Sequence, residues 1–447
     1  MLPTLALALC IVFVLFLLRL EHKQSPDITR ALWVPTVWVL YIASKPLGIW
    51  FQSASGAPEA GSPLDRTFQI FLMLVALVIL VRREFDWSGA IKENPWLVAL
   101  ILFMLVSVIW SDLPTISFKR WVRELLAVLM AFVVLSEPSP RKALESILRR
   151  ATYVLIPFSP LLIKYFHEYG VEYGPWSGEE MWIGVTLQKN SLASLCMISI
   201  VFLIWSLIRR WQGHNAQVWK YQTLMEIFVL GLAFWLMGGP RGNIFYSATS
   251  VYALSAGLLV YGGYFIAKRY NRRISSGALR SAVIVIIVFG VVSVYTGGSR
   301  LRFFASSAGR DATLTGRTEV WASLLPVVMR SPLIGGGFGG FWTPRTQELF
   351  RITGAHSGYL DVLIGLGFAG VVLVSLFFLS SCRKAHQELS RDFDWGILWI
   401  CYIIMSVVHN IGESSMDSFT SYLTAIVLFF TVSSSPIFRA KSDSVGN

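Results

Sequence analysis

Residues 357–380 read SGYLDVLIGLGFAGVVLVSLFFLS and carry a single charged side chain, Asp361, in 24 positions. A helix rises about 1.5 Å per residue, so about 20 consecutive apolar residues cross the roughly 30 Å hydrocarbon core of a bilayer. The stretch is therefore long and apolar enough to span a membrane as a helix. Its apolar residues run continuously instead of alternating, which excludes a strand of a membrane β-barrel.

The same pattern recurs along the whole chain of 447 residues, of which 55% are hydrophobic and only 14% are charged. A water-soluble globular protein of this size would carry more charge and fewer apolar residues. The sequence therefore predicts an all-α polytopic membrane protein with about 12–13 transmembrane helices, folded as a single membrane domain over residues 1–447. The predicted spans cover residues 2–19, 31–50, 66–82, 95–112, 120–136, 149–166, 189–209, 223–239, 242–267, 279–296, 357–380, 395–412 and 418–433.

Positive charges predict how the chain is oriented in the membrane. The first apolar run begins at Met1 without a preceding basic residue, and Arg19 and Lys23 follow it. A cleaved signal peptide would show the reverse order, and the positive-inside rule places the N-terminus on the outer side. With this orientation every connection on the inner side is basic.

The sequence does not predict a metal site. The four cysteines, Cys10, Cys196, Cys382 and Cys401, lie in or beside apolar runs without C-x-x-C spacing, which argues against a zinc site or a redox pair. Asp392-Phe393-Asp394 has a D-x-D spacing that can hold a divalent cation, but it falls on a basic inward connection. No cofactor is expected either.

One segment breaks the charge trend. Gly297–Ala355 should lie on the outer side, yet it contains seven arginines against three carboxylates, a net charge of +4. A long loop can be translocated despite such a charge. Its guanidinium groups can bind an anion such as phosphate, or they can pair with lipid headgroups. Arg300 and Arg302, near the start of the segment, are candidates for substrate binding.

The second half of this segment has a recognisable order of local structure. Arg317 stands in Gly316-Arg317-Thr318-Glu319-Val320-Trp321, which opens an amphipathic stretch that runs to Met329. A break at Ser331-Pro332 and the glycine cluster Gly335–Gly340 follow. This order predicts a helix, a sharp break and a close-packed turn. Since no G-x-G-x-x-G motif follows a strand here, a nucleotide fingerprint is not supported.

Three further side chains are candidates on the same outer side. His356 lies where the polar segment meets the next span, and its imidazole suits proton transfer, although such a histidine can also be a packing residue. Arg241 lies on the very short connection Gly239–Asn243, where an arginine is either functional or extended toward headgroups. Lys189 can contact an anion or mark the membrane boundary.

The order of these motifs resembles the O-antigen ligase and polymerase superfamily. The likeness rests on the outer Arg-Gly hairpin, the G-R-x-x-x-W sequence, the Pro-Leu-Ile-Gly-x-Gly turn and the histidine that opens the next helix, and its core covers residues 185–375, including a periplasmic loop at 297–355. Residues 32–36 and 62–66 look more like the exopolysaccharide polymerase branch. The sequence departs from the family at Ser357, where an asparagine usually follows the histidine.

The resemblance implies a GT-C-like, metal-independent glycosyltransferase in the bacterial cytoplasmic (inner) membrane, with its active site on the periplasmic face. It implies a polyprenyl-diphosphate-linked glycan donor and a glycan or lipid-linked acceptor. Arg241 and Arg317 match the arginines thought to hold the donor diphosphate, and His356 matches the histidine proposed to activate the acceptor hydroxyl. A flippase and a chain-length regulator are the expected partners besides membrane lipids, and no nucleic acid is expected.

Two other functions compete with this interpretation. Within the superfamily we prefer an exopolysaccharide polymerase, the branch that residues 32–36 and 62–66 resemble, over an O-antigen ligase. The two share a site and differ only in the acceptor. The alternative from another class is a transporter or flippase for a lipid-linked or anionic polysaccharide. Transporters tend to show related halves and charges near mid-membrane. Here the spans carry few charges at mid-depth, with Asp361 as a candidate, and no related halves are apparent.

Overall fold

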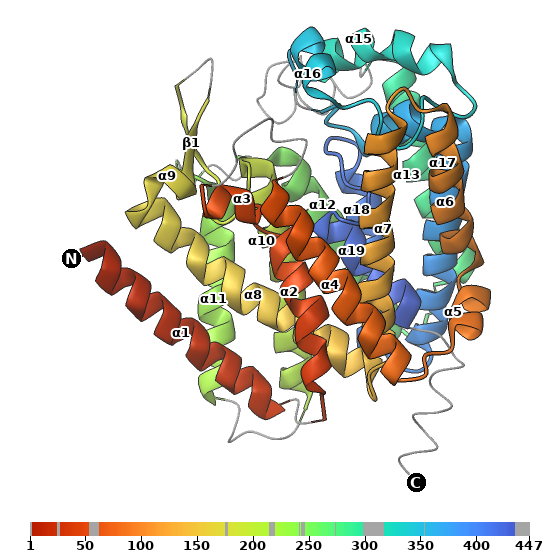
Figure 1. Ribbon diagram of the computed structural model, residues 1–447. Coiled ribbons are helices and arrows are strands. Elements are labelled where there is room, and N and C mark those ends of the chain that lie inside the picture. The colour runs from red at the N-terminus through yellow and green to blue at the C-terminus, as the bar shows by residue number, and fades with distance from the viewer. Residues whose placement is uncertain are drawn as a thin grey trace.

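The computed structural model describes residues 2–24, 27–52, 62–174, 178–213, 220–240, 242, 246–272, 274–297, 317–352 and 354–433. Within these ranges the chain is almost entirely helical (Figure 1). The helices are α1 (Leu2–Gln24), α2 (Trp33–Ile42), α3 (Leu47–Trp50), α4 (Pro63–Arg82), α5 (Trp87–Glu93), α6 (Pro95–Val106), α7 (Pro114–Leu135), α8 (Pro140–Tyr165), α9 (His167–Gly170), α10 (Lys189–Gln212), α11 (Lys220–Gly238), α12 (Ala248–Arg269), α13 (Ser276–Tyr295), α15 (Arg317–Arg330), α16 (Pro344–Phe350), α17 (Gly358–Leu389), α18 (Phe393–His409) and α19 (Tyr422–Ser433). The strands β1 (Val171–Tyr173) and β2 (Glu180–Trp182) form one antiparallel hairpin.

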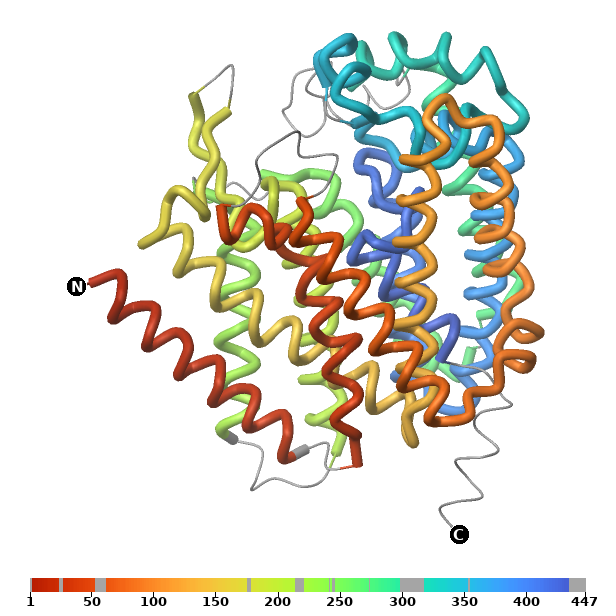
Figure 2. Tube along the Cα trace, in the orientation of Figure 1, coloured from red at the N-terminus to blue at the C-terminus, as the bar shows by residue number. Residues whose placement is uncertain are grey.

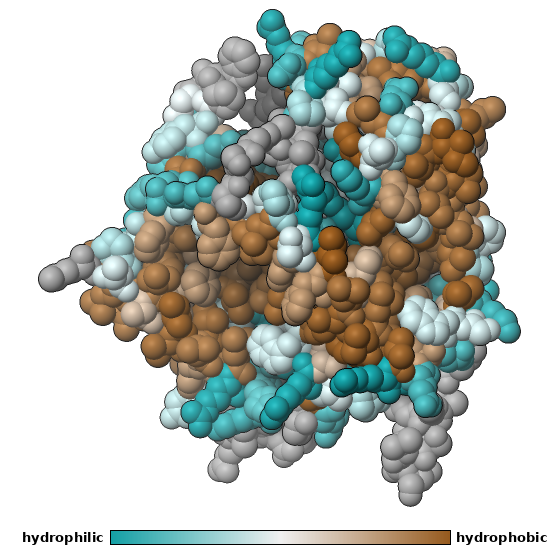
Figure 3. All heavy atoms as spheres, viewed as in Figure 1, coloured by the Kyte–Doolittle hydropathy of each residue, from teal (hydrophilic) through white to brown (hydrophobic). Residues whose placement is uncertain are grey.

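The prediction of an all-α polytopic membrane protein is confirmed. Among the described residues, eight helices are long and apolar enough to cross a membrane, and a ninth span is possible if the bent pair Trp87–Glu93 and Pro95–Trp110 is one unit. The surface in Figure 3 carries a broad hydrophobic band between two hydrophilic ends. Such a band is what a bilayer requires of the side chains that face it.

The number of full-length spans is lower than the predicted 12–13. A helix lies at each predicted position, but α2, α18 and α19 are shorter apolar helices, and α7 contains Lys119, Arg120, Arg123 and Glu124. The predicted span at residues 31–50 is divided because α2 ends at Ile42, just before Lys45-Pro46. A residue before proline is forced out of the helical region, so an apolar run can continue where the helix cannot.

The C-terminal helices occupy the middle of the bundle. Figure 2 shows them between the orange helices of the N-terminal part and the green helices of the middle of the chain. Helix α18 packs against α12, α17 and α10, and α19 packs against α7 and α18. Trp399 and Tyr402 of α18 are fully buried. Helices that are apolar on all sides belong in the interior, which agrees with the central position of α18 and α19.

Helices α15 and α16 and the β1–β2 hairpin all lie at one end of the bundle, which we call the α15 end (Figure 1). Helix α15 confirms the amphipathic helix that was predicted from Arg317 to Met329, and it ends one residue later. Its buried side chains include Trp321, Leu324 and Val328, which face the bundle. The polar segment of the sequence is therefore anchored to the membrane helices and does not stand apart from them.

The glycine turn after α15 fills a break in α17. Gly367, inside α17, has φ 62° and ψ −161°, so the helix is interrupted there. The N–H of Gly336 donates to Ile364 O at 2.8 Å, and the N–H of Phe368 donates to Pro332 O at 2.8 Å. A break inside a membrane helix leaves polar backbone groups that need new partners, and the turn supplies them. The predicted close packing of these glycines is thus what the structure shows.

Replacing Gly335 by alanine should destabilise this contact. Gly335 has φ +68°, and a Cβ there would lie 2.5 Å from the backbone of Gly365 and Leu366. We expect Gly335→Ala to cost about 1–3 kcal/mol, seen as a lower Tm in detergent. Gly354→Ala is the matched control, since nothing lies within 4 Å of its added Cβ. Equal Tm values for the two variants would contradict the close packing.

Candidate active site

A buried carboxylate, Glu413, joins side chains from several elements at the α15 end. It lies in the connection between α18 and α19, and one of its oxygens, Oε1, forms an ion pair with Arg317. Asn190 donates from Nδ2 to the same oxygen at 2.6 Å. The second oxygen, Oε2, lies 3.7 Å from Nδ1 of His356. We call Arg317, His356, Glu413 and Asn190 the Glu413 cluster.

His356 is held by the backbone of the same connection. Its φ of 50° is in the left-handed region, and Gly358, two residues later, donates its N–H to Asn410 O and Glu413 O at 3.0 Å each. A side chain on Gly358 would collide with Asn410, so the turn into α17 requires glycine here. The His356 side chain is 31% exposed and is thus open to a substrate on one side.

Arg317 is positioned by α15 and by a second contact. Its Nη1 donates to Thr249 Oγ1 of α12 at 3.1 Å, while Nη2 pairs with Glu413. Trp321, one turn later, donates from Nε1 to Ala355 O at 2.9 Å, which ties α15 to the residue before His356. Arg317 and His356, 39 positions apart in the sequence, are therefore held on one frame.

The charges of the cluster favour an ionised Glu413. Burial by itself would raise the pKa of this carboxyl, but the contact with His356 and the positive charge of Arg317 outweigh it and hold the pKa below its ordinary value. A carboxylate that faces Nδ1 favours the proton on that nitrogen, and this tautomer leaves Nε2 to act as a base. The guanidinium has five N–H donors, so Arg317 can contact an anion while it is paired with Glu413.

Glutamine at position 413 should remove part of the pH dependence of stability. Because the folded-state pKa lies below 4.5, the stabilisation by the carboxylate is complete above that pH and is lost as the pH falls through the lower folded value. We expect the Tm of the wild-type protein to fall more steeply between about pH 5 and pH 3 than the Tm of Glu413→Gln. Parallel Tm curves would contradict the pairing of Glu413 with Arg317 and His356.

Two of the six predicted site residues, Arg317 and His356, meet at Glu413. A third, Lys189, is the first residue of α10 and lies over the ring of Tyr246 at 5.4 Å, while its neighbour Asn190 contacts Glu413. Lys189 is thus at the edge of the cluster. The other three, Arg241, Arg300 and Arg302, lie outside the described residues, and their roles stay predictions.

The Glu413 cluster also contains residues that were not identified from the sequence. Glu413 and Asn190 were not predicted, although Glu413 lies in the polar stretch between the last two predicted spans, on the same predicted side as His356. Asp361, near the start of α17, does not pair with His356. Its Oδ1 instead accepts a hydrogen bond from Trp342 Nε1 at 2.7 Å, and its other oxygen accepts one from Ser414.

A polar cavity adjoins the cluster. Its volume is about 190 Å³, and Glu413 and Asn190 form part of its wall. Hydroxyl and amide groups dominate the rest, among them those of Gln188, Ser191, Ser194 and Ser415. Such groups both donate and accept hydrogen bonds, which suits them to the hydroxyls of a sugar.

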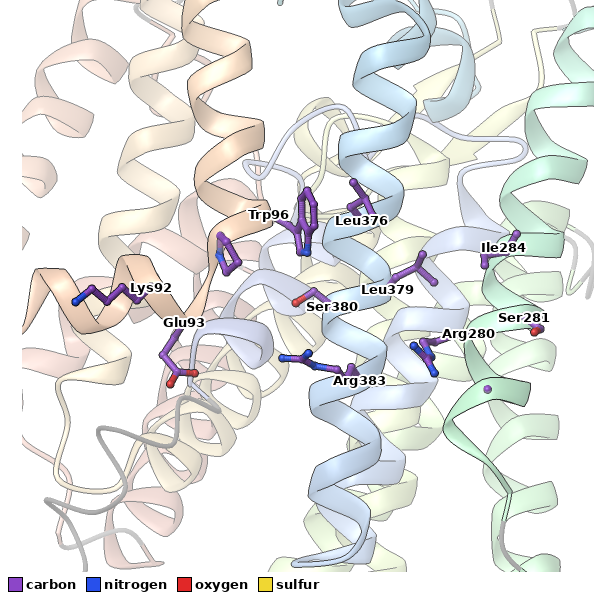
Figure 4. Close-up of a pocket in the computed structure, with 12 residues that line it drawn as sticks. Lys92, Glu93, Trp96, Arg280, Ser281, Ile284, Leu376, Leu379, Ser380 and Arg383 are labelled. Atoms are coloured by element: carbon purple, nitrogen blue, oxygen red, sulfur yellow. The ribbon is translucent and has the colours of Figure 1, made fainter.

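A larger cavity lies elsewhere. It has a volume of about 690 Å³ and is formed by residues of α5, α6, α13 and α17, among them Trp96, Arg280 and Arg383 (Figure 4). None of the cluster residues lines it. Size alone therefore does not locate the site, whereas the convergence of charged groups does. Within the described ranges, no group of three or more histidine, cysteine, aspartate or glutamate residues is arranged to hold a metal ion.

Comparison with known proteins agrees with the resemblance found in the motifs. Residues 242–375 match the family model described as O-antigen ligase, a range that contains Arg317 and His356 but not Glu413. The chain is also 24% identical over 324 residues to the exopolysaccharide production protein ExoQ of Rhizobium meliloti (strain 1021), and the match covers 67% of each chain. The predicted similarity to the O-antigen ligase and polymerase superfamily, with its exopolysaccharide branch, is thereby confirmed.

Proposed function

We propose that this chain is a membrane glycosyltransferase that polymerises glycans carried on polyprenyl diphosphate, as an exopolysaccharide polymerase. The observation that carries the proposal is the convergence of Arg317, His356 and Glu413 at one end of the bundle. The two comparisons support a membrane polysaccharide polymerase or ligase over the transporter alternative. The similarity to an exopolysaccharide production protein favours the polymerase over an O-antigen ligase.

The reaction follows from the chemistry of the cluster. A hydroxyl oxygen of the acceptor glycan attacks the anomeric carbon of the donor, and its proton passes to Nε2 of His356. The bond between the anomeric carbon and the diphosphate oxygen breaks, and the electron pair leaves with the polyprenyl diphosphate. We assign to Arg317 the stabilisation of the negative charge that grows on this leaving group, and Arg241 is expected to assist it. Preorganised charge of this kind is a major source of catalysis.

Glu413 acts in this scheme through its two neighbours. It touches Arg317 with one oxygen and faces His356 with the other, so it fixes the separation between the anion-binding group and the base. Preorganised positions matter because a displacement of about 1 Å can cost a factor of 100 in rate. The polar cavity, whose wall includes Glu413 and Asn190, offers a place for a sugar ring beside the cluster.

The proposed location follows from the orientation of the charges. We place the α15 end on the periplasmic side of the bacterial inner membrane, where the polar segment was predicted from the positive-inside rule. A flippase would then be needed to deliver the lipid-linked glycan, and a chain-length regulator would be a suitable partner at the same face.

Product analysis tests the proposed polymerase. Purified protein in liposomes is supplied with a polyprenyl-diphosphate-linked repeat unit, with and without a lipid A core acceptor. We expect a ladder of longer glycans that remain attached to polyprenyl diphosphate, formed without the core acceptor. Transfer to the core alone would support the ligase and contradict polymerisation. Movement of intact lipid-linked glycan across the bilayer without any new glycosidic bond would support the transporter.

A further inference from the structure

A cationic cavity lies at the α15 end, separate from the Glu413 cluster. It is a groove of about 240 Å³ between α4 and α7, and none of the cluster residues lines it. Arg66 of α4 and Lys119 and Arg123 of α7 contribute positive charges to its wall. In the part of the chain that the structure describes, its lining includes no aspartate or glutamate. We call this the α4–α7 groove.

The groove changes from cationic to apolar along the helices. Both helices begin at the α15 end and run toward the opposite end (Figure 1). On α7, Lys119 comes before Leu126, and on α4, Arg66 comes before Met73, with both members of each pair in the groove wall. A separation of seven residues is two helical turns, about 10 Å along the axis, so the members of a pair lie on one face. On the face drawn in Figure 3, hydrophilic side chains gather over this region with a hydrophobic band directly below.

The acidic residues nearest in sequence are engaged elsewhere. Glu124 follows Arg123, but its two oxygens accept hydrogen bonds from Ser418 Oγ and Phe419 N at 2.6 Å each. Asp65 precedes Arg66, and its carboxylate accepts the N–H groups of Leu47 and Gly48. Lys119 and Arg123 form no ion pair with any described residue. Cations kept beside an apolar wall are costly and thus candidates for binding.

A charged rim above an apolar channel matches a lipid that carries phosphate. The guanidinium of Arg123 can bind phosphate oxygens bidentately, and Lys119 adds a point charge. Below them, Ile70, Met73 and Leu126 would contact a hydrocarbon chain. From the α15 end inward, the groove thus presents cations first and apolar side chains second. A lipid diphosphate in the bilayer has the same order, with its diphosphate at the surface and its hydrocarbon chain inside.

The groove is linked to the cluster through one short connection. Ser418 and Phe419, which bind Glu124, lie five and six residues after Glu413 in the same connection between α18 and α19. Five residues span at most about 18 Å. An oligosaccharide whose carrier sits in the groove can therefore extend to the base at His356.

We propose that the α4–α7 groove binds the diphosphate of the acceptor, a second polyprenyl-diphosphate-linked glycan. This inference rests on the proposed polymerase function, because polymerisation joins two lipid-carried glycans and releases the carrier of only one. The donor diphosphate leaves from Arg317, whereas the acceptor keeps its carrier and needs a separate anchor. Two cationic sites at one end of the bundle meet that requirement.

Binding stoichiometry tests the proposal independently of turnover. His356→Ala protein, which should not turn over, is mixed with a polyprenyl-diphosphate oligosaccharide, and the bound molecules are counted by native mass spectrometry. We expect two bound molecules in this background, one after Lys119→Gln with Arg123→Gln, and one after Arg317→Ala. The control pair Arg345→Gln and Arg351→Gln removes two exposed cations from the α15 end outside the groove and should retain two.

Several outcomes would overturn the proposal. A maximum of one bound molecule before the groove is changed would do so even if the protein proves to be a polymerase. Displacement of the second molecule by phosphatidylglycerol at equal concentration would assign the groove to an ordinary anionic lipid. Failure of the unmodified protein to join glycans would instead remove the proposed function, so the two failures are distinguishable. Unchanged Tm values of the groove variants exclude misfolding as the cause of lost binding.

Discussion

Arg317→Ala is expected to slow the release of polyprenyl diphosphate by about 100-fold to 1,000-fold. The guanidinium and the proposed base both face Glu413, and loss of one charge-stabilising donor costs about 3–4 kcal/mol in the barrier. The measurement is the initial rate of release from a lipid-linked repeat unit in proteoliposomes. Arg330→Ala is the matched control, because Arg330 ends the same helix and is exposed, and it should keep the wild-type rate.

Lysine at position 317 separates charge from geometry. It keeps the positive charge but loses the planar fork that can contact Glu413, Thr249 and a diphosphate together. We expect Arg317→Lys to remain well below the wild-type rate. A variant with alanine at position 317 that works as fast as the Arg330→Ala control would remove Arg317 from the mechanism.

His356→Ala is expected to lower kcat by about 100-fold to 10,000-fold with little change in the KM for the donor. A positioned general base contributes a factor of this size, and its removal affects the transition state more than the binding of the donor. Kinetics at saturating and limiting donor separate the two parameters. His167→Ala, which changes an exposed histidine at the start of α9, should behave as wild type.

Parallel loss of donor binding would point to a different role for His356. If the KM for the donor rose in proportion to the loss of rate, the imidazole would be a binding group. Unchanged kcat and KM in His356→Ala would show that another group accepts the proton, and the site would have to be assigned anew.

Hydropathy predicted the class of fold because the membrane requires continuous apolar helices, and this requirement is visible in sequence. It did not reveal where helices are interrupted. The interruption of α17 at Gly367 lies inside the most apolar run of the chain, and only the packing of the glycine turn against it explains the break. The end of α2 likewise depends on Lys45-Pro46. Hydropathy averaged over a long window does not reveal this local break.

The sequence predicted those site residues that lie within a recognisable local motif. Arg317 and His356 were identifiable because one opens a predicted helix within the polar segment and the other directly follows the segment, in a recognisable order of motifs. Glu413 was not, because its importance comes from contacts with residues 57 and 96 positions away. Only the folded chain brings the connection between α18 and α19 beside α15 and the start of α17.

The stoichiometry of transfer tests the central claim most directly. Purified protein in proteoliposomes receives a defined polyprenyl-diphosphate oligosaccharide, and released polyprenyl diphosphate and newly joined glycan are quantified together, with and without EDTA. We predict one polyprenyl diphosphate released for each glycan joined, at the same rate in both buffers, and both products formed at least about 100-fold more slowly with His356→Ala. Absence of both release and joining in either buffer, or release without joining, would contradict the account.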